Sequence, residues 1–248
     1  MVVGICDWGI GGLGFYNLLR DERPDLDVLY IGDQGVPGYG LFDRSSLTRR
    51  MEQVFGVFRA EGISNVVVAC NAASTVVPYL DVEGVIGHGI IEPTLRAVDR
   101  LPKSSMGVIG GRRTIRSGAY RRALQKQGWE VRQRVAQPLS RRIEDGEAQT
   151  PDTQALLSNI LAPLRGGEYI MLACTHYIVL EPAVKKNLPN AKVIDPATEA
   201  WLQFHTQLPP KTENIGSSRF LTTGSADAMN RQSKLAFGVD LISEEITI

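Results

Sequence analysis

Short apolar segments alternate with amphipathic segments along most of this chain. In the first part of the chain the predicted strand and helix pairs are 2–6 with 15–21, 28–31 with 45–61, and 66–69 with 74–80. Apolar runs of this length followed by segments with helical periodicity are typical of βαβ units built around a parallel sheet. The pattern therefore predicts an α/β fold from the first residues onward.

A second series of the same kind follows. Its predicted strands are 106–109, 131–135 and 169–173, its predicted helices are 117–127, 154–161 and 181–187, and the final strand, helix and strand are 219–222, 225–237 and 239–248. We predict two similar Rossmann-like α/β domains with parallel sheets and a site in the cleft between them. The first domain comprises residues 1–94 plus 205–248, and the second comprises residues 95–204. Residues 209–214 are predicted to form a loop.

One short pattern occurs once in each predicted domain. Residues 66–71 and 169–175 both consist of an apolar strand, then Ala-Cys, then a small polar residue, which places Cys70 and Cys174 at equivalent positions. Ligands of open parallel sheets bind at the carboxyl ends of the strands. We therefore expect both cysteines at the ligand-binding edge of their sheets.

Composition excludes several classes of protein. The 248 residues contain 27 Lys plus Arg and 27 Asp plus Glu, so net charge gives no reason to expect a nucleic acid or a membrane surface as partner. No apolar run approaches the roughly 20 residues that span a bilayer, and no leader is expected before 2–6. The three cysteines fit neither a disulfide framework nor a metal-ligand spacing. We expect a cytoplasmic protein with reduced thiols, a small-molecule substrate and no metal.

The glycine-rich segment 9–14 permits three interpretations. It fits G-x-G-x-x-G between a strand and a helix, with Asp33 about twenty residues further on, as in dinucleotide-binding proteins. Asp7 argues against that interpretation because its carboxylate lies where a pyrophosphate has to approach. The second interpretation is an anion-receptive turn for a substrate carboxylate, with Asp7 reserved for proton chemistry. The third is a tight turn with no ligand.

Cys70 and Cys174 are the strongest candidates for chemistry, whereas Cys6 fits a small core residue. Polar residues follow each candidate directly: Asn71 after the first, and Thr175 and His176 after the second. A cysteine at a strand-to-helix turn lies near amide N–H groups, which favour the thiolate. His176 is placed to orient or protonate the sulfur of Cys174.

Two thiols facing one substrate suit a specific reaction. The α-proton of an amino acid is weakly acidic, so stereoinversion needs a base on one face of the carbon and an acid on the other, both shielded from water. One cysteine from each domain meets this requirement. No lysine motif indicates a Schiff base, and we expect no pyridoxal phosphate and no other cofactor.

At these residues the sequence resembles the glutamate racemase family, and the resemblance runs almost end to end. The matching segments are C-D-W-G-I-G-G-L at 6–13, Y-G at 39–40, A-C-N-A-A-S at 69–74, I-E-P at 91–93, T-I-R-S-G-A-Y at 114–120 and C-T-H-Y at 174–177. The resemblance implies that Asp7 assists Cys70, that His176 assists Cys174, and that Glu144 is the family's acidic residue. It also implies a dimer of two-domain subunits that makes D-glutamate for cell-wall peptidoglycan.

The departures from the family pattern fall among the predicted substrate-binding residues. Trp8 stands where the family has serine, Ala72 and Gly111 where it has threonine, and Gly38 where it has proline. Each lost hydrogen bond to a charged group weakens binding by about 1.5–3 kcal/mol. The predicted substrate-binding residues are Trp8, Gly38, Tyr39, Gly40, Asn71, Ala72, Ser74, Thr114 and Thr175.

The sequence therefore predicts a cofactor-independent amino-acid racemase, with glutamate as the substrate that the resemblance favours. A racemase of aspartate or another amino acid, a non-catalytic binding member of the family and a dinucleotide-binding oxidoreductase remain as alternatives. The substrate depends on how Trp8 and Gly111 shape the pocket.

Overall fold

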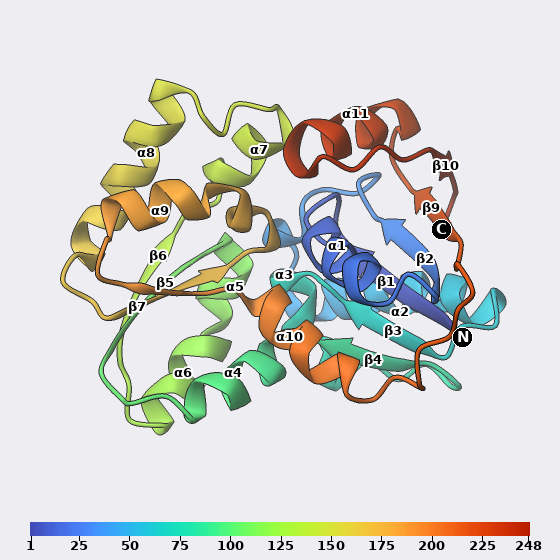
Figure 1. Cartoon of the computed structure of the whole chain (residues 1–248), viewed down its shortest axis with the longest axis horizontal. Helices are drawn as coiled ribbons and strands as arrows, with labels where there is room; N and C mark the ends of the chain where they lie inside the picture. The colour runs from blue at the N-terminus through green and yellow to red at the C-terminus, as the bar shows by residue number, and fades with distance from the viewer.

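A computed structural model describes all residues, 1–248, and contains two parallel β-sheets flanked by helices (Figure 1). The larger sheet has six strands in the order β10-β9-β2-β1-β3-β4. Their bounds are Ser243–Glu245 (β10), Ser218–Thr222 (β9), Asp27–Gly32 (β2), Val2–Asp7 (β1), Asn65–Val68 (β3) and Ile86–Gly89 (β4). Every neighbouring pair in this sheet is parallel. We refer to this sheet and the helices that pack on it as the first lobe.

The smaller sheet has four strands in the order β6-β5-β7-β8, again all parallel. Their bounds are Glu130–Val135 (β6), Ser105–Gly110 (β5), Tyr169–Ala173 (β7) and Lys192–Ile194 (β8). This sheet and its helices form the second lobe, which lies beside the first (Figure 1). The predicted α/β fold class with two sets of parallel strands is confirmed.

Helices connect the strands in both lobes. The α-helices are Leu13–Glu22 (α1), Arg44–Ala60 (α2), Asn71–Ser74 (α3), Ile91–Asp99 (α4), Arg112–Ser117 (α5), Ala119–Lys126 (α6), Pro138–Glu144 (α7), Pro151–Leu161 (α8), Glu181–Asn187 (α9), Pro196–His205 (α10) and Ala226–Phe237 (α11). Short 3₁₀ segments cover Tyr39–Leu41 (η1), Val77–Tyr79 (η2), Ala162–Leu164 (η3) and Thr175–Leu180 (η4). None of the helices combines the length and apolar composition that a bilayer-spanning segment requires.

Alternating residues of each central strand pack on opposite faces of the sheet. In β2, Val28 and Tyr30 join a core with α1, α10 and α11, while Leu29 and Ile31 join a core with α2 on the other face. In β5, Val108 packs with α4 and α6, and Ile109 packs with α7 and α8. Strands buried on both faces explain the nearly continuous apolar runs in the sequence.

The strands of each lobe come from separate stretches of the chain. Strands of the first lobe come from residues 2–89 and 218–245, those of the second from 105–194, and both termini lie beside the six-stranded sheet (Figure 1). Helix α10 packs Trp201 and Phe204 into the core of the first lobe. We therefore propose that the chain returns to the first lobe at about Pro196, ahead of the predicted residue 205.

Local structure differs from the sequence prediction in several places. The helix expected over 74–80 is reduced to α3 and η2, because Pro78 lacks an N–H and β-branched residues precede it. Only β10 forms within the strand expected over 239–248. The unpredicted elements are β4, β8, α4, α5, α7 and α10, together with the 3₁₀ segments η1, η3 and η4. In β4, the segment Gly87–Gly89 has low strand propensity and becomes a strand by pairing with β3.

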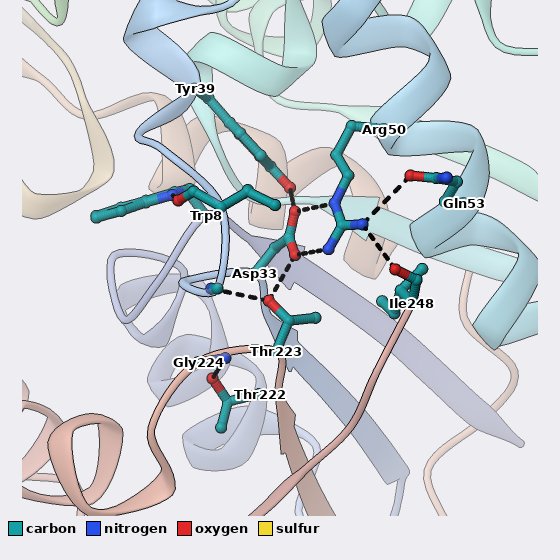
Figure 2. A network of polar contacts seen from close by, with 11 residues as sticks. Trp8, Asp33, Tyr39, Arg50, Gln53, Thr222, Thr223, Gly224 and Ile248 are labelled. Carbon is teal, nitrogen blue, oxygen red and sulfur yellow. Dashed lines mark hydrogen bonds and ion pairs between the residues drawn. The ribbon is translucent and has the colours of Figure 1, made fainter.

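A buried ionic network ties five segments of the first lobe together (Figure 2). Asp33, directly after β2, is fully buried and accepts hydrogen bonds from Arg50 of α2 at 2.5 and 2.8 Å. Its carboxylate also accepts from the hydroxyls of Tyr39 and Thr223, both at 2.7 Å. Arg50 additionally donates to the side chain of Gln53 and to the backbone oxygen of Ile248. This network fixes the position of η1 relative to β2 and β9.

Replacing Arg50 by methionine tests how much this network contributes to the free energy of unfolding. The change leaves the Asp33 carboxylate buried without its bidentate cation, so we expect the free energy of unfolding to fall by about 3–5 kcal/mol. Urea denaturation followed by circular dichroism measures it. Arg219→Met is the matched control, because Arg219 pairs with Glu61 and Glu244 at the surface and should change stability by less than about 1 kcal/mol. Equal effects of the two substitutions would contradict the proposed contribution of the network to stability.

Candidate active site

Cys70 and Cys174 open onto the same cavity, which has a volume of about 590 Å³. The first lobe contributes Asp7, Trp8 and Asn71 to its walls, among others, and the second contributes Thr114 and Glu144. The cavity therefore lies between the lobes, where the sequence predicts the site.

The two cysteines occupy equivalent positions in the two lobes. Cys70 lies two residues beyond the end of β3 and directly precedes α3, and Cys174 follows β7 and directly precedes η4. Both have extended backbone, with φ and ψ of −120° and 123° at Cys70 and −154° and 129° at Cys174. The repeated Ala-Cys pattern thus corresponds to a repeated strand-to-helix turn, and both sulfurs are presented at carboxyl ends of strands.

On the second-lobe side, Cys174 belongs to a short chain of polar groups. Its Sγ lies 3.9 Å from Nδ1 of His176, whose Nε2 lies 3.0 Å from a carboxylate oxygen of Glu144. The Oγ of Ser140 lies 3.5 Å from the same sulfur. The side chains of His176 and Glu144 are only 5% and 3% exposed, so this pair is shielded from water.

The charge of His176 follows from its partners. Burial on its own lowers the pKa of the imidazole, but hydrogen bonds and charge interactions with Cys174 and Glu144 outweigh it and raise the pKa well above its usual value. The direction of this shift favours the imidazolium form of His176. A cation at this position stabilises negative charge on a neighbouring sulfur.

On the first-lobe side, Cys70 faces a carboxyl group in place of a cation. Burial raises the pKa of the Cys70 thiol well above its usual value, and the charge of Asp7 raises it further. Burial also raises the pKa of Asp7, although His176 and hydrogen bonds from Gly9 N and Thr175 Oγ1 oppose the shift. Those two hydrogen bonds measure 3.1 and 2.9 Å. Cys70 is therefore held as a thiol, and Asp7 is placed to exchange a proton in its vicinity.

The two halves of the cavity thus carry opposite electrostatic environments. One sulfur lies beside an imidazolium, and the other is a buried thiol beside a carboxyl group. Such an arrangement supplies a base and an acid at the same time, which the removal and return of a proton at one carbon requires.

Most of the predicted substrate-binding residues line the cavity. They are Trp8, Gly38, Tyr39, Gly40, Asn71, Ala72, Thr114 and Thr175. Ser74 does not line this cavity, which corrects its prediction as a substrate-binding residue. Its hydroxyl donates to Val68 O and accepts from Ile90 N, which joins α3 to β3 and α4. Its side chain lines a separate cavity of about 670 Å³.

The residues that depart from the family pattern differ in what surrounds them. The indole N–H of Trp8 donates to Val36 O at 3.0 Å, so the ring is tethered and forms a fixed apolar wall. In Figure 2 this ring points away from Asp33. A Cβ at Gly111 would lie 3.1 Å from Oε1 of Gln137, whereas one at Gly38 would meet nothing within 4 Å. The space beside Gly111 is therefore occupied by Gln137, which also lines the cavity.

The glycine-rich segment 9–14 packs against the second lobe outside the cavity, which argues against the interpretation of a carboxylate-binding turn. None of its residues lines the cavity. A Cβ at Gly11 would lie 2.4 Å from Oγ1 of Thr175 and 2.6 Å from Nδ1 of His176. The glycine thus allows the second lobe to approach Asp7 closely.

The contacts at Gly11 also bear on the interpretation of segment 9–14 as a dinucleotide-binding turn. A pyrophosphate has no access to the glycine turn, because Thr175 and His176 cover it, and Asp33 is engaged by Arg50. The oxidoreductase interpretation is therefore wrong. No group of three or more His, Cys, Asp or Glu side chains is arranged to hold a metal ion.

Several cavity residues were not predicted from the sequence. Ser140 lies four residues before Glu144 on α7, a spacing that places both on one helix face and could have indicated it. Gln137 and three cationic residues, Arg112, Arg113 and Arg141, also line the cavity. No spacing rule singles out these arginines among the others, because their relation to the cavity depends on how the lobes meet.

Comparisons with known proteins agree with this geometry. Residues 42–203 match a family described as Asp/Glu/Hydantoin racemase. The chain is 31% identical over 240 residues to the glutamate racemase of Shouchella clausii, covering 91% of this chain and 86% of that protein. It is 29% identical to that of Aquifex pyrophilus, covering 97% and 95%.

A solved structure is similar over the whole molecule. The crystal structure of glutamate racemase isoform RacE1 from Bacillus anthracis superposes with a TM-score of 0.90 at 25% sequence identity, covering 100% of this chain and 97% of that one. The family match covers well over half of the residues and includes Cys70 and Cys174. This chain therefore belongs to the Asp/Glu/Hydantoin racemase family.

Proposed function

We propose that this protein is a cofactor-independent amino-acid racemase that interconverts L- and D-glutamate. The observation that carries the proposal is that Cys70 and Cys174, from different lobes, open onto one cavity with opposite electrostatic partners. The named glutamate racemases of Shouchella clausii and Aquifex pyrophilus support glutamate as the substrate.

The reaction transfers one proton at each face of the α-carbon. A thiolate removes the α-proton, so the Cα–H bond breaks, an S–H bond forms and the electron pair stays on the carbon and its carboxylate. The opposite thiol then gives its proton to the other face, which leaves a thiolate there and the inverted amino acid. The reverse reaction uses the same two groups with their roles exchanged. His176 and Asp7 hold or accept the protons that restore the starting state.

The cavity also suits an acidic substrate. Arg112 and Arg113 supply positive charge on the second-lobe side, where Arg141 is paired with Asp145. Asn71 and Thr175 supply polar groups beside the cysteines. A dicarboxylic amino acid has two anionic groups to place against these residues. Trp8 provides the apolar wall, and its tethered indole limits the shape of the side chain that fits.

Proton exchange in D₂O tests the proposal directly. Purified protein without added pyridoxal phosphate is incubated with L-glutamate, and we expect deuterium at Cα together with formation of D-glutamate. A panel that includes aspartate and the other common amino acids separates glutamate from another substrate. Absence of exchange with every amino acid, in a protein shown to be folded, would indicate a binding member of the family.

Serine substitution of either cysteine tests the two-base mechanism. An alcohol is a far weaker acid than a thiol, so Cys70→Ser and Cys174→Ser should each reduce racemisation by at least about 10²-fold. Exchange with solvent can persist on the face served by the remaining cysteine, so deuterium incorporation is followed for each enantiomer separately. Cys6→Ser, a core position outside the cavity, is the control. Turnover like that of the wild type in either single variant would exclude the mechanism.

Glu144→Gln tests the role of the buried ion pair. The carboxylate is one of the groups that raise the pKa of His176, while burial acts to lower it. Removing the charge therefore lowers that pKa, so the imidazolium is lost at a lower pH. We expect the alkaline limb of the pH profile of kcat/KM to move to lower pH, with activity at pH 8 reduced by about tenfold.

Glu147→Gln is the matched control for this substitution. Glu147 is half exposed and pairs with Arg142 outside the cavity, so its loss should leave the pH profile unchanged. A profile of Glu144→Gln that keeps the wild-type alkaline limb would show that the carboxylate does not set the charge of His176.

We also propose that the protein acts as a cytoplasmic homodimer that supplies D-glutamate for peptidoglycan. The proposal rests on the resemblance to glutamate racemases. Sedimentation velocity at micromolar concentration should give a mass near twice the monomer value of 27.2 kDa. A single monomeric species at that concentration would exclude the dimer.

A further inference from the structure

A tyrosine of the second lobe contacts a cavity residue of the first. Tyr120, in α6, is fully buried and donates a hydrogen bond of 2.8 Å from its hydroxyl to Oδ1 of Asn71 in α3. Tyr120 packs with Val108 and Leu124 in the core of the second lobe and does not line the cavity. The contact therefore joins the interior of one lobe to the substrate-facing edge of the other.

Only one of the two polar atoms of the Asn71 amide has a hydrogen-bond partner in the protein. Asn71 is 2% exposed and lines the cavity, and its Nδ2 has no hydrogen-bond partner. A buried donor without a partner is costly, so native structures rarely leave one without a functional reason. The unpartnered group is an N–H donor, and its natural ligand is an acceptor such as a carboxylate.

We propose that Tyr120 is a positioning residue that fixes the orientation of the Asn71 amide. With the carbonyl oxygen engaged by Tyr120, the NH₂ group is presented to the substrate carboxylate. Without this hydrogen bond the amide can turn, and its carbonyl oxygen then faces the carboxylate and repels it. The inference rests on the proposed function, because it takes an amino acid as the ligand.

A double-mutant cycle tests the inference through KM. Tyr120→Phe removes only the hydroxyl, so we expect KM to rise about tenfold for both enantiomers, while kcat stays within about twofold. Asn71→Ala removes the donor and should raise KM at least as much. In the double variant Tyr120→Phe should add nothing further, because the amide that it positions is absent.

Tyr16→Phe is the matched control. The Tyr16 hydroxyl lies 2.9 Å from Oγ of Ser218 in the first lobe, away from the cavity, so this variant should keep the wild-type KM and kcat. Thermal unfolding of every variant reports any loss of folded protein. A general packing defect at Tyr120 would lower the melting temperature and the active fraction without raising KM.

The outcomes separate the inference from the proposed function. An unchanged KM in Tyr120→Phe, a decrease confined to kcat, or additive effects in the double variant would overturn the positioning role while leaving the racemase proposal intact. Absence of turnover in the wild-type protein would overturn the racemase proposal, and this inference with it.

Discussion

The hydrogen bond between Thr175 and Asp7 is the contact on which the geometry of the site depends. It joins Thr175, which follows Cys174, to Asp7, whose carboxyl group raises the pKa of the Cys70 thiol. The hydrogen bond crosses the boundary between the lobes. Gly11 makes the contact possible, because any side chain there would collide with Thr175 and His176. Further buried or half-buried hydrogen bonds cross the same boundary, from Tyr120 to Asn71 and from Arg113 to Thr75 and Phe42 O. Two sulfurs on separate sheets can therefore face one small substrate.

The electrostatics of the site follow from burial as much as from charge. Water would screen the interaction of His176 with Glu144 and weaken its effect on the pKa of His176. In the site, that pair favours a cation beside Cys174, whereas burial and Asp7 keep Cys70 protonated. The two thiols are chemically identical, and their surroundings alone make one suited to accept a proton and the other to donate one. Motion between the lobes that admitted water would weaken this difference.

The sequence predicted the fold class because buried parallel strands leave a strong apolar signal. It also predicted that both cysteines lie at carboxyl ends of strands, since the Ala-Cys repeat marks equivalent turns. It could not predict the function of segment 9–14, because a glycine that approaches a ligand and one that approaches another lobe look the same in sequence. Ser74 was misplaced for a related reason: its hydroxyl faces the backbone of β3, a direction that depends on the short α3 helix. The arginines of the cavity were missed because their placement depends on how the lobes pack.

Substrate recognition in this chain differs from the family pattern in a coordinated way. Gly40 and Gly111 come from different lobes, yet a Cβ on either would lie within about 3 Å of Oε1 of Gln137, at 2.9 and 3.1 Å. The same oxygen accepts a hydrogen bond from the backbone N–H of Arg112. The side chain of Gln137 thus occupies space that a threonine at position 111 would fill. The amide of Gln137, directly before α7, and the fixed indole of Trp8 accompany the loss of a hydroxyl at position 111. The pocket thus keeps polar groups but has a different shape. Selectivity among acidic amino acids should therefore depend on both Gln137 and Trp8, because both line the cavity and each has a fixed hydrogen-bond partner.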